Sequence, residues 1–166
     1  MTMRIGLLSD THGHMDDRIL KLLGGCDEIW HAGDIGDLRV TDQLAKVAPV
    51  RAVYGNIDDH LARRQWPENQ IFTINDLKIW MTHIGGRPGR YSQGIGEQMR
   101  GEKPGLFVCG HSHILLVQND PTYNLLVMNP GAAGLHGFHK MRTMLRFRIN
   151  DGRPCDLEVV ELGKRA

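Results

Sequence analysis

The sequence has few cysteines, no long apolar run and no excess of either charge. Its 166 residues include three cysteines with no paired spacing, Cys26, Cys109 and Cys155. This sparse, odd count argues against a disulfide framework and against a thiolate zinc site, and it favours a reducing compartment. No segment approaches the ~20 consecutive apolar residues that a membrane span needs, and the first apolar run, residues 5–8, is too short for a secretory signal. We therefore expect a soluble, cytoplasmic protein with no membrane partner.

The chain also lacks a charge bias. It carries 20 basic and 19 acidic side chains, so nothing predicts the basic patch that proteins binding nucleic-acid polymers usually have. A nuclease acting on polymers is therefore disfavoured, whereas a small phosphate ester stays open as a substrate because a metal site supplies its own positive charge. With 41% hydrophobic residues, the chain is long enough and apolar enough to form one domain over residues 1–166. A homodimer is compatible with this size, but no residue pattern argues for one.

Strand and helix patterns alternate in the first third of the chain. Short apolar runs predict strands at residues 4–8, 28–32 and 50–54, and helical spacing of apolar residues predicts helices at 16–23 and 37–48. This order predicts parallel strands joined by helices. Ligands of such sheets bind at the carboxyl ends of the strands.

The remainder reads mostly as strands. These are expected at residues 70–74, 77–82, 106–109, 115–118, 125–128, 143–149 and 156–162. A Gly-rich loop at 84–89 and a helix at 92–100 interrupt them, and Asn150-Asp151-Gly152 predicts a hairpin turn. Two sheets packed face to face, with helices outside, would accommodate both the alternating strands and helices of the first third and the strands of the remainder.

Five polar motifs each follow a predicted strand. They are Asp10-Thr11-His12, Gly33-Asp34-Ile35-Gly36-Asp37, Gly55-Asn56-Ile57-Asp58, the single residue His83, and Gly110-His111-Ser112-His113. Each motif alone is weak, because a lone histidine after a strand more often packs or faces solvent than binds a metal. All five in order favour a pair of divalent metals, which takes oxygen and nitrogen ligands with a carboxylate suited to bridge. Seven side chains provide that set: Asp10, His12, Asp34, Asn56, His83, His111 and His113.

The order of these residues resembles that of the calcineurin-like metallophosphoesterases. The short chain resembles their small bacterial and archaeal phosphodiesterase branch, which is also similar to the small retromer subunit of eukaryotes. The match extends from Asp10 to Asn129-Pro130-Gly131, a turn found in that branch. The resemblance implies an α/β fold, a four-layer αββα sandwich of two mixed β-sheets flanked by helices.

The resemblance also implies how the ligands divide. Asp10, His12, Asp34 and His113 would hold one metal ion, and Asp34, Asn56, His83 and His111 the second, with Asp34 as the bridge. Manganese is the metal associated with this branch, while iron, zinc, nickel and cobalt also suit the ligands. The implied activity is hydrolysis of a phosphodiester by in-line attack of a metal-bridging hydroxide. The alternatives are a phosphomonoesterase and a protein-binding scaffold with a vestigial metal site.

The third motif departs from the larger relatives. Many of them have a histidine directly after the Gly-Asn pair, where it protonates the leaving group, and Ile57 stands there in this chain. Asn56 and Asp58 are the candidate catalytic residues of the motif, although Asp58 is as well explained by a hydrogen bond that orients Asn56 or its loop. Loss of a general acid typically costs about 10²–10⁴-fold in rate. We therefore expect slow turnover and a preference for good leaving groups such as phenolates.

Four loop residues leave their roles open. Arg87 and Arg90 could hold a phosphate oxygen, but a solvated loop is the favoured interpretation. His136 and His139 could line a substrate cleft, but surface or packing roles are favoured. The natural substrate, the metal and the oligomeric state are not encoded in any motif.

Overall fold

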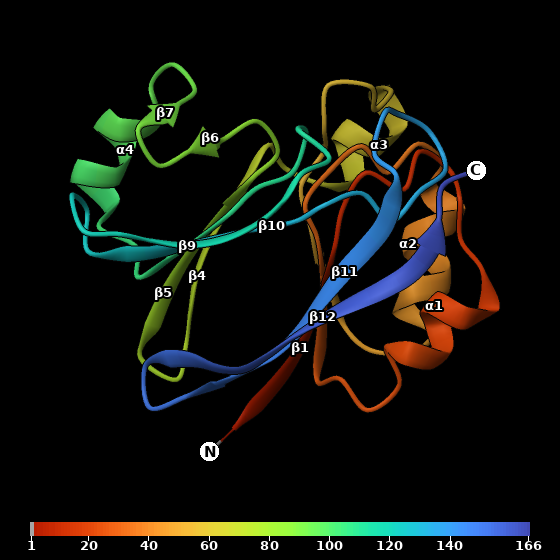
Figure 1. The fold of residues 1–166 in the computed structure, drawn as a ribbon, viewed down its shortest axis with the longest axis horizontal. Coiled ribbons are helices and arrows are strands. Elements are labelled where there is room, and N and C mark those ends of the chain that lie inside the picture. Colours follow the sequence, from red (N-terminus) through yellow and green to blue (C-terminus); the bar gives the residue numbers. More distant parts are fainter. Residues whose placement is uncertain (1) are drawn as a thin grey trace.

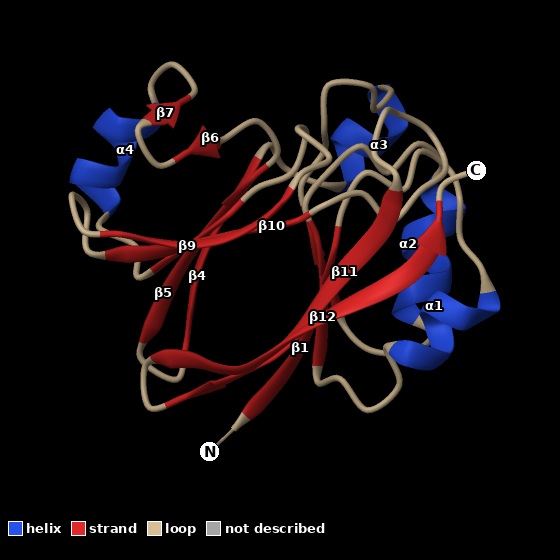
Figure 2. Ribbon diagram, in the orientation of Figure 1, coloured by secondary structure: helices blue, strands red, loops and turns tan. Residues whose placement is uncertain are grey.

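The computed structural model describes residues 2–166 and arranges them as two β-sheets packed face to face (Figures 1 and 2). The first sheet has the strand order β12-β11-β1-β2-β3. Its strands are β1 (Met3–Leu8), β2 (Glu28–His31), β3 (Val50–Ala52), β11 (Met141–Asn150) and β12 (Arg153–Lys164). Strands β1, β2 and β3 are parallel, whereas β11 pairs antiparallel with both β1 and β12, so the sheet is mixed.

The second sheet is also mixed and has the order β4-β5-β8-β10-β9. Its strands are β4 (Asn69–Ile74), β5 (Leu77–Thr82), β8 (Leu106–Val108), β9 (Leu115–Asp120) and β10 (Leu125–Pro130). The three central strands are parallel, and the edge strands β4 and β9 are antiparallel to their neighbours. A separate two-stranded ribbon, β6 (Gly86–Arg87) and β7 (Arg90–Tyr91), follows β5.

The helices cover the outer faces of the sandwich, as Figure 2 shows. Helices α1 (Asp17–Leu22) and α2 (Leu38–Ala45) pack on the first sheet, and α4 (Ile95–Glu102) packs on the second. Helix α3 (His60–Gln65) follows β3. An aspartate side chain caps each of the first three helices, because Asp16, Asp37 and Asp59 accept backbone N–H groups of the first turn.

Three apolar layers hold the four structural layers together. The central one lies between the sheets and joins side chains such as Leu7 and Trp30 to Met81 and Leu106. A second layer packs the first sheet against α1 and α2, and a third packs Trp80 and Phe107 of the second sheet against α4. The predicted αββα sandwich of two mixed sheets is therefore confirmed.

Local details differ from the sequence prediction. Helix α3 was not predicted, because it has six residues and buries only Ala62, which leaves no apolar periodicity to detect. The predicted loop at 84–89 forms part of the β6–β7 ribbon. The predicted helix at 92–100 starts later, because Gly94 has a left-handed φ of 84° that breaks the helix before Ile95. Within residues 2–166, no helix is long and apolar enough to cross a membrane.

One edge of the sandwich collects all five polar motifs. The motifs follow β1, β2, β3, β5 and β8, whose carboxyl ends meet there. Backbone hydrogen bonds join the loops directly: the amide of Asp10 donates to Gly33 O, and the amide of Gly110 donates to His83 O. The parallel topology therefore brings together residues that lie as far apart in sequence as Asp10 and His113.

Candidate metal centre

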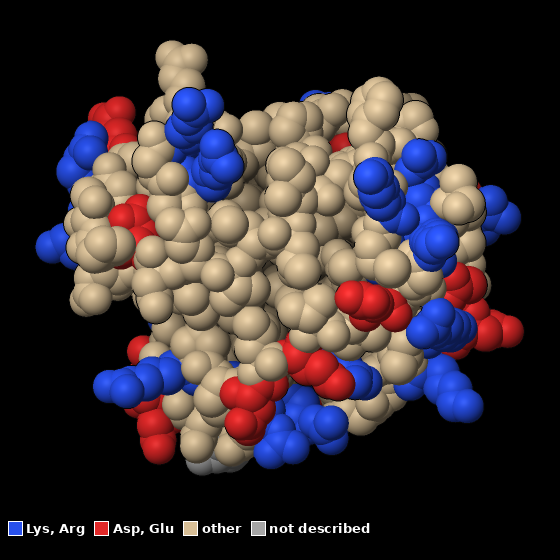
Figure 3. Space-filling model, in the orientation of Figure 1, with Lys and Arg blue, Asp and Glu red and all other residues tan. Residues whose placement is uncertain are grey.

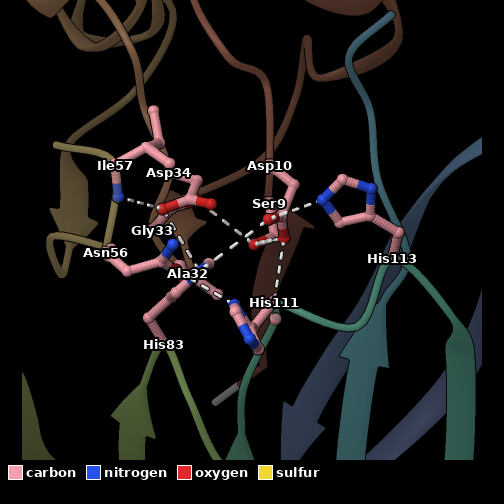
Figure 4. Close-up of polar contacts among 12 residues, drawn as sticks. Ser9, Asp10, Ala32, Gly33, Asp34, Asn56, Ile57, His83, His111 and His113 are labelled. Carbon is pink, nitrogen blue, oxygen red and sulfur yellow. Dashed lines mark hydrogen bonds and ion pairs between the residues drawn. The ribbon is translucent and has the colours of Figure 1, made fainter. Parts of the chain in front are cut away.

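The seven predicted ligands form one cluster: Figure 4 labels six of them, Asp10 included, and His12 joins through its contacts with Asp10 and Asp34. Oδ1 of Asp10 lies 3.1 Å from Nε2 of His113 and 3.8 Å from Nε2 of both His12 and His83. Asn56 joins the cluster through its Oδ1, which lies 3.0 Å from Nδ1 of His111. The structure thus brings every predicted ligand to the same place.

The cluster divides into two groups of three residues, and the carboxylate of Asp34 contacts a histidine of each. The ligand atoms of Asp10, His12 and His113 all lie within 4.8 Å of one another, and so do those of Asp34, His83 and His111. Asp34 faces both groups, because its Oδ2 is 3.4 Å from Nε2 of His12 and its Oδ1 is 3.2 Å from Nε2 of His83. A carboxylate with one oxygen towards each group has the arrangement that a bridging ligand requires.

Three buried ligand atoms have no hydrogen-bond partner: Asp10 Oδ1, His12 Nε2 and His83 Nε2. Buried polar atoms without a partner are costly, by about 1–3 kcal/mol each and more when the group is charged. These three atoms face one another, so bound cations would satisfy them together. The residues present therefore fit a divalent-metal site.

The His83 ring is oriented for metal binding by its other nitrogen. Nδ1 lies 2.7 Å from the carbonyl oxygen of Ala32, which can only accept a hydrogen bond. Nδ1 must therefore carry a proton, so that whenever the ring is neutral Nε2 presents its lone pair to the cluster.

The carboxylates and imidazoles shift one another's pKa values. Burial raises the pKa of Asp10, but the imidazoles of His113 and His12 beside the carboxylate outweigh burial and hold the pKa well below its usual range. Burial also raises the pKa of Asp34, and the neighbouring imidazoles of His12 and His83 outweigh it in the same way. The carboxylates of Asp10 and Asp34 in turn raise the pKa of His12 to about 9. The site therefore keeps its carboxylates ionised and attracts cations, and a metal ion bound there displaces protons.

Five of the seven ligands have a left-handed backbone, with φ between 46° and 72°: Asp10, His12, Asp34, His111 and His113. This conformation is uncommon for residues other than glycine, although aspartate and histidine adopt it more readily than most. Each such residue costs on the order of 1 kcal/mol, and clusters of them occur at functional sites. The loops here are therefore shaped to aim their side chains at one point.

Two motif positions require glycine because neighbouring atoms lie too close for a Cβ, and not because of their backbone torsion angles. A Cβ at Gly55 would overlap Oδ1 and the backbone nitrogen of Asp34. A Cβ at Gly110 would overlap Oγ of Ser9 and come within 2.7 Å of Oδ2 of Asp10. The two carboxylates therefore sit directly against backbone that has no side chain.

Asp58 holds two of the loops together instead of facing the cluster. Its buried carboxylate accepts the backbone N–H groups of Ile35, Gly36 and Gly55 at 3.1, 2.9 and 2.7 Å. These contacts are those of the loop-orienting alternative, since they join the loop of Asp34 to the loop of Asn56.

His31 joins the first two motifs through a chain of hydrogen bonds that sequence reasoning did not identify. The amide of Gly33 donates to Nδ1, so Nε2 carries the ring proton and donates to Oγ1 of Thr11, whose hydroxyl donates to Ile35 O. Burial lowers the pKa of His31 to about 4, which keeps the ring neutral. His31 shows no metal-ligand spacing, so the only signal available was its place in a buried strand.

Asn129 supports the fifth motif and was also not predicted as a site residue. Its Nδ2 donates to Gly110 O at 3.0 Å and to Oγ of Ser112 at 3.1 Å, and its Oδ1 accepts the amide of Gly131. The Asn-Pro-Gly turn that ends the resemblance to the family therefore holds the loop of His111 and His113.

Two clefts open from the cluster, and Asn56 lines both. One, of about 520 Å³, is lined by His12, Asp34, His111 and His113 together with the apolar side chains of Ile57, Ile114 and Phe138. The other, of about 570 Å³, reaches His83 and is lined by polar residues that include Arg63, Ser92 and Gln98. The site is therefore accessible from two directions.

The four residues with open roles lie near the first cleft. His136 and His139 line it, with ring centroids 4.8 Å from His12 and 5.1 Å from His113 respectively. A place in the wall of the cleft is the less favoured of the two roles considered for these histidines in the sequence analysis. Arg87 and Arg90 are exposed cross-strand partners in the β6–β7 ribbon, over which basic side chains gather in Figure 3. They line a neighbouring hollow that shares Ser112 and Ile114 with the cleft.

Comparison with known families identifies the fold and the chemistry. The sequence profile of the calcineurin-like phosphoesterase superfamily domain matches residues 3–152. The chain belongs to this superfamily. Its members are metal-dependent phosphoesterases, which agrees with the candidate metal groups in the structure.

Two curated relatives come from Methanocaldococcus jannaschii. A protein named a probable metallophosphoesterase is 33% identical over 142 residues, which cover 79% of this chain and 68% of the relative. A protein named a phosphodiesterase is 26% identical over 145 residues, which cover 78% of this chain and 83% of the relative.

Solved structures support the fold. An archaeal phosphodiesterase superposes with a TM-score of 0.77 at 21% identity, covering 96% of this chain and all of that one. A Vps29 variant from Entamoeba histolytica superposes with a TM-score of 0.74 at 19% identity, covering 97% and 100%. At these identities the likeness concerns the fold alone.

Proposed function

We propose that the protein is a phosphodiesterase that uses two divalent metal ions to hydrolyse a small phosphate ester. The observation that carries the proposal is the position of Asp34, whose two carboxylate oxygens face one ligand of each group at 3.4 and 3.2 Å. Asp10, His12, Asp34 and His113 would hold one ion, and Asp34, Asn56, His83 and His111 the other. When bound, the cations activate water as the nucleophile and neutralise charge on the phosphate. Manganese is our first choice of metal, with iron, zinc, nickel and cobalt compatible with the ligands.

The two clefts support a diester as the substrate. A phosphodiester carries two substituents, whereas a monoester carries one. Clefts of about 520 and 570 Å³ meet at Asn56, so a phosphate at the cluster could direct one substituent into each. The name of the phosphodiesterase relative points the same way.

The chain supplies no proton donor at the position after Asn56. Ile57 is 45% exposed in the cleft, and Asp58 is occupied by three backbone amides. Asn56 then contributes as a ligand, and the leaving group takes its proton from water. This assignment retains the expectation of slow turnover and of a preference for phenolate leaving groups.

A polymeric nucleic acid is not the proposed substrate. On the face drawn in Figure 3, basic and acidic side chains are mixed and form no continuous basic stripe. A cytoplasmic enzyme acting on a small molecule is the simplest proposal that accommodates this surface.

The test is hydrolysis of bis(p-nitrophenyl) phosphate and p-nitrophenyl phosphate with added manganese, with the wild type, Asp34→Asn and Asp42→Asn. Asp42 is an exposed carboxylate on α2 and serves as the matched control. We expect manganese-dependent activity that is higher on the diester, lost in Asp34→Asn and unchanged in Asp42→Asn. Higher activity on the monoester would favour the phosphomonoesterase. Folded protein that neither binds manganese nor hydrolyses either ester would favour the scaffold, the alternative raised by the Vps29 neighbour.

A further inference from the structure

The mouth of the first cleft is apolar although its floor consists of metal-ligand residues. Phe138 is fully exposed, and Ile114 and Ile57 are 66% and 45% exposed. All three line the same cleft as Asp34, Asn56 and the ligand histidines other than His83. We name Ile57, Ile114 and Phe138 the apolar rim. Scattered exposed apolar residues are ordinary, whereas these three line one cleft beside the ligand cluster and so form a continuous candidate for binding.

The loop that carries Phe138 is fixed to the metal centre. Gly137 has a left-handed φ of 131° and packs so closely on His113 that a Cβ there would overlap the imidazole. On the C-terminal side of Phe138, two contacts hold His139 in place. Its Nε2 lies 2.9 Å from Gly134 O, and its carbonyl oxygen accepts a hydrogen bond from Nε of Arg165 at 2.8 Å. Phe138 is therefore exposed on a loop whose two neighbouring residues are held in place by packing and hydrogen bonds.

We propose that the apolar rim binds a flat apolar substituent of the substrate, a nucleobase or another aromatic ring, while the metal centre holds its phosphate. This inference rests on the proposed function and names the substrate class of the same site. A ring stacked on an aromatic side chain gains about 1–3 kcal/mol, as stacking of bases on proteins shows, and it does so without base-specific hydrogen bonds. The cleft volume of about 520 Å³ lies within the usual range for sites of small ligands. Continuity with the ligand cluster decides the occupant, because a phosphate at the cluster brings its own substituent against the rim.

The test measures binding rather than turnover. Phenylphosphonate, methylphosphonate and inorganic phosphate are titrated calorimetrically into manganese-loaded protein, because the carbon–phosphorus bonds of the two phosphonates are not hydrolysed. We expect wild type to bind phenylphosphonate on the order of tenfold more tightly than methylphosphonate. Phe138→Ala should remove that preference and leave the affinity for inorganic phosphate unchanged. Phe138→Trp should retain it, and Leu157→Ala, which alters an apolar side chain of similar accessibility to Ile57 on the distant strand β12, should have no effect.

Four results would overturn the inference, and they are distinguishable. Equal affinity of wild type for the two phosphonates would remove the apolar subsite while leaving the phosphate site and the proposed function intact. A preference that survives in Phe138→Ala would show that the rim does not provide it. Metal-loaded protein that binds none of the three compounds would contradict the proposed function as well. If instead Phe138→Ala converts a dimer to a monomer in light scattering without changing any of the three affinities, the rim covers a second copy of the chain.

Discussion

Replacing Asp58 by alanine should loosen the metal centre without removing any ligand. The carboxylate is 4% exposed and accepts three backbone amides from two loops at 2.7–3.1 Å. A hydrogen bond to a charged group is worth about 1.5–3 kcal/mol, and a buried donor left without a partner costs a similar amount. Because the three share one side chain and do not add fully, we expect a total loss of about 3–5 kcal/mol in the free energy of unfolding. For a chain of this length that corresponds to a fall of about 10 °C in Tm.

The assay separates a positioning role for Asp58 from proton donation. Thermal unfolding, manganese affinity by calorimetry, and turnover on an aryl and an alkyl diester are measured together. A positioning residue should lower Tm and metal affinity, and should reduce both turnover rates by the same factor, with recovery at high manganese. Asp59→Ala is the matched control, because Asp59 accepts two amides of α3 at 3.1 and 3.0 Å and its loss should cost only about 1 kcal/mol. Unchanged Tm and metal affinity in Asp58→Ala, with a rate loss confined to the alkyl diester, would refute this reasoning and make Asp58 the proton donor.

Three further predictions follow from the same contacts. Burial depresses the pKa of His31 to about 4, below its ordinary 6.5, so the unfolded chain takes up a proton first as the pH falls. In denaturant titrations, the free energy of unfolding of wild type should therefore fall by up to about 3 kcal/mol between pH 6.5 and 4. His31→Gln should lose less stability over the same range. Gly55→Ala should weaken manganese binding in calorimetry, because its Cβ overlaps Asp34, whereas Gly101→Ala, in open space on α4, should bind normally and gain about 0.5–1 kcal/mol of stability. Removal of metal by a chelator should lower the Tm of wild type but not that of Asp34→Asn. Manganese affinity should rise as the pH approaches 9, because the pKa of metal-free His12 is raised to about 9 and its proton must leave when the metal binds.

The sequence is informative where a motif coincides with the end of a strand. Asp10, Asp34 and Asn56 each follow a short apolar run that forms a parallel strand, and parallel strands end at a common edge. The convergence of these side chains was therefore predictable from the order of elements alone. The assignment of each ligand to one of two metal ions came from the resemblance to the family. The two groups of three residues in the structure agree with that assignment.

A loop-orienting role for Asp58 was one of two alternatives that the sequence left open, but the partners of the residues that hold the ligand loops were not predictable. Asp58 accepts amides 22 and 23 residues away, and His31 meets Thr11 across 20 residues, so both roles exist only after the sheet has formed. Helix α3 was missed for the opposite reason, because its aspartate cap is visible in the sequence but its single buried residue leaves no periodic pattern. Asp58 and His31 share a titratable side chain in or near a motif with no place in the ligand set, and their burial appears only in the structure.

The strain at the site favours an occupied metal centre over a vestigial one. Five ligands have left-handed backbone, and three buried ligand atoms lack hydrogen-bond partners. Each of these features lowers the free energy of unfolding of the metal-free chain by on the order of 1 kcal/mol. A bound cation would offset the cost, because it satisfies the unpaired atoms and stabilises the loop conformation that presents them. A chain that binds no metal would bear this cost without compensation, whereas a metallophosphoesterase needs the ligands held in place before the substrate arrives.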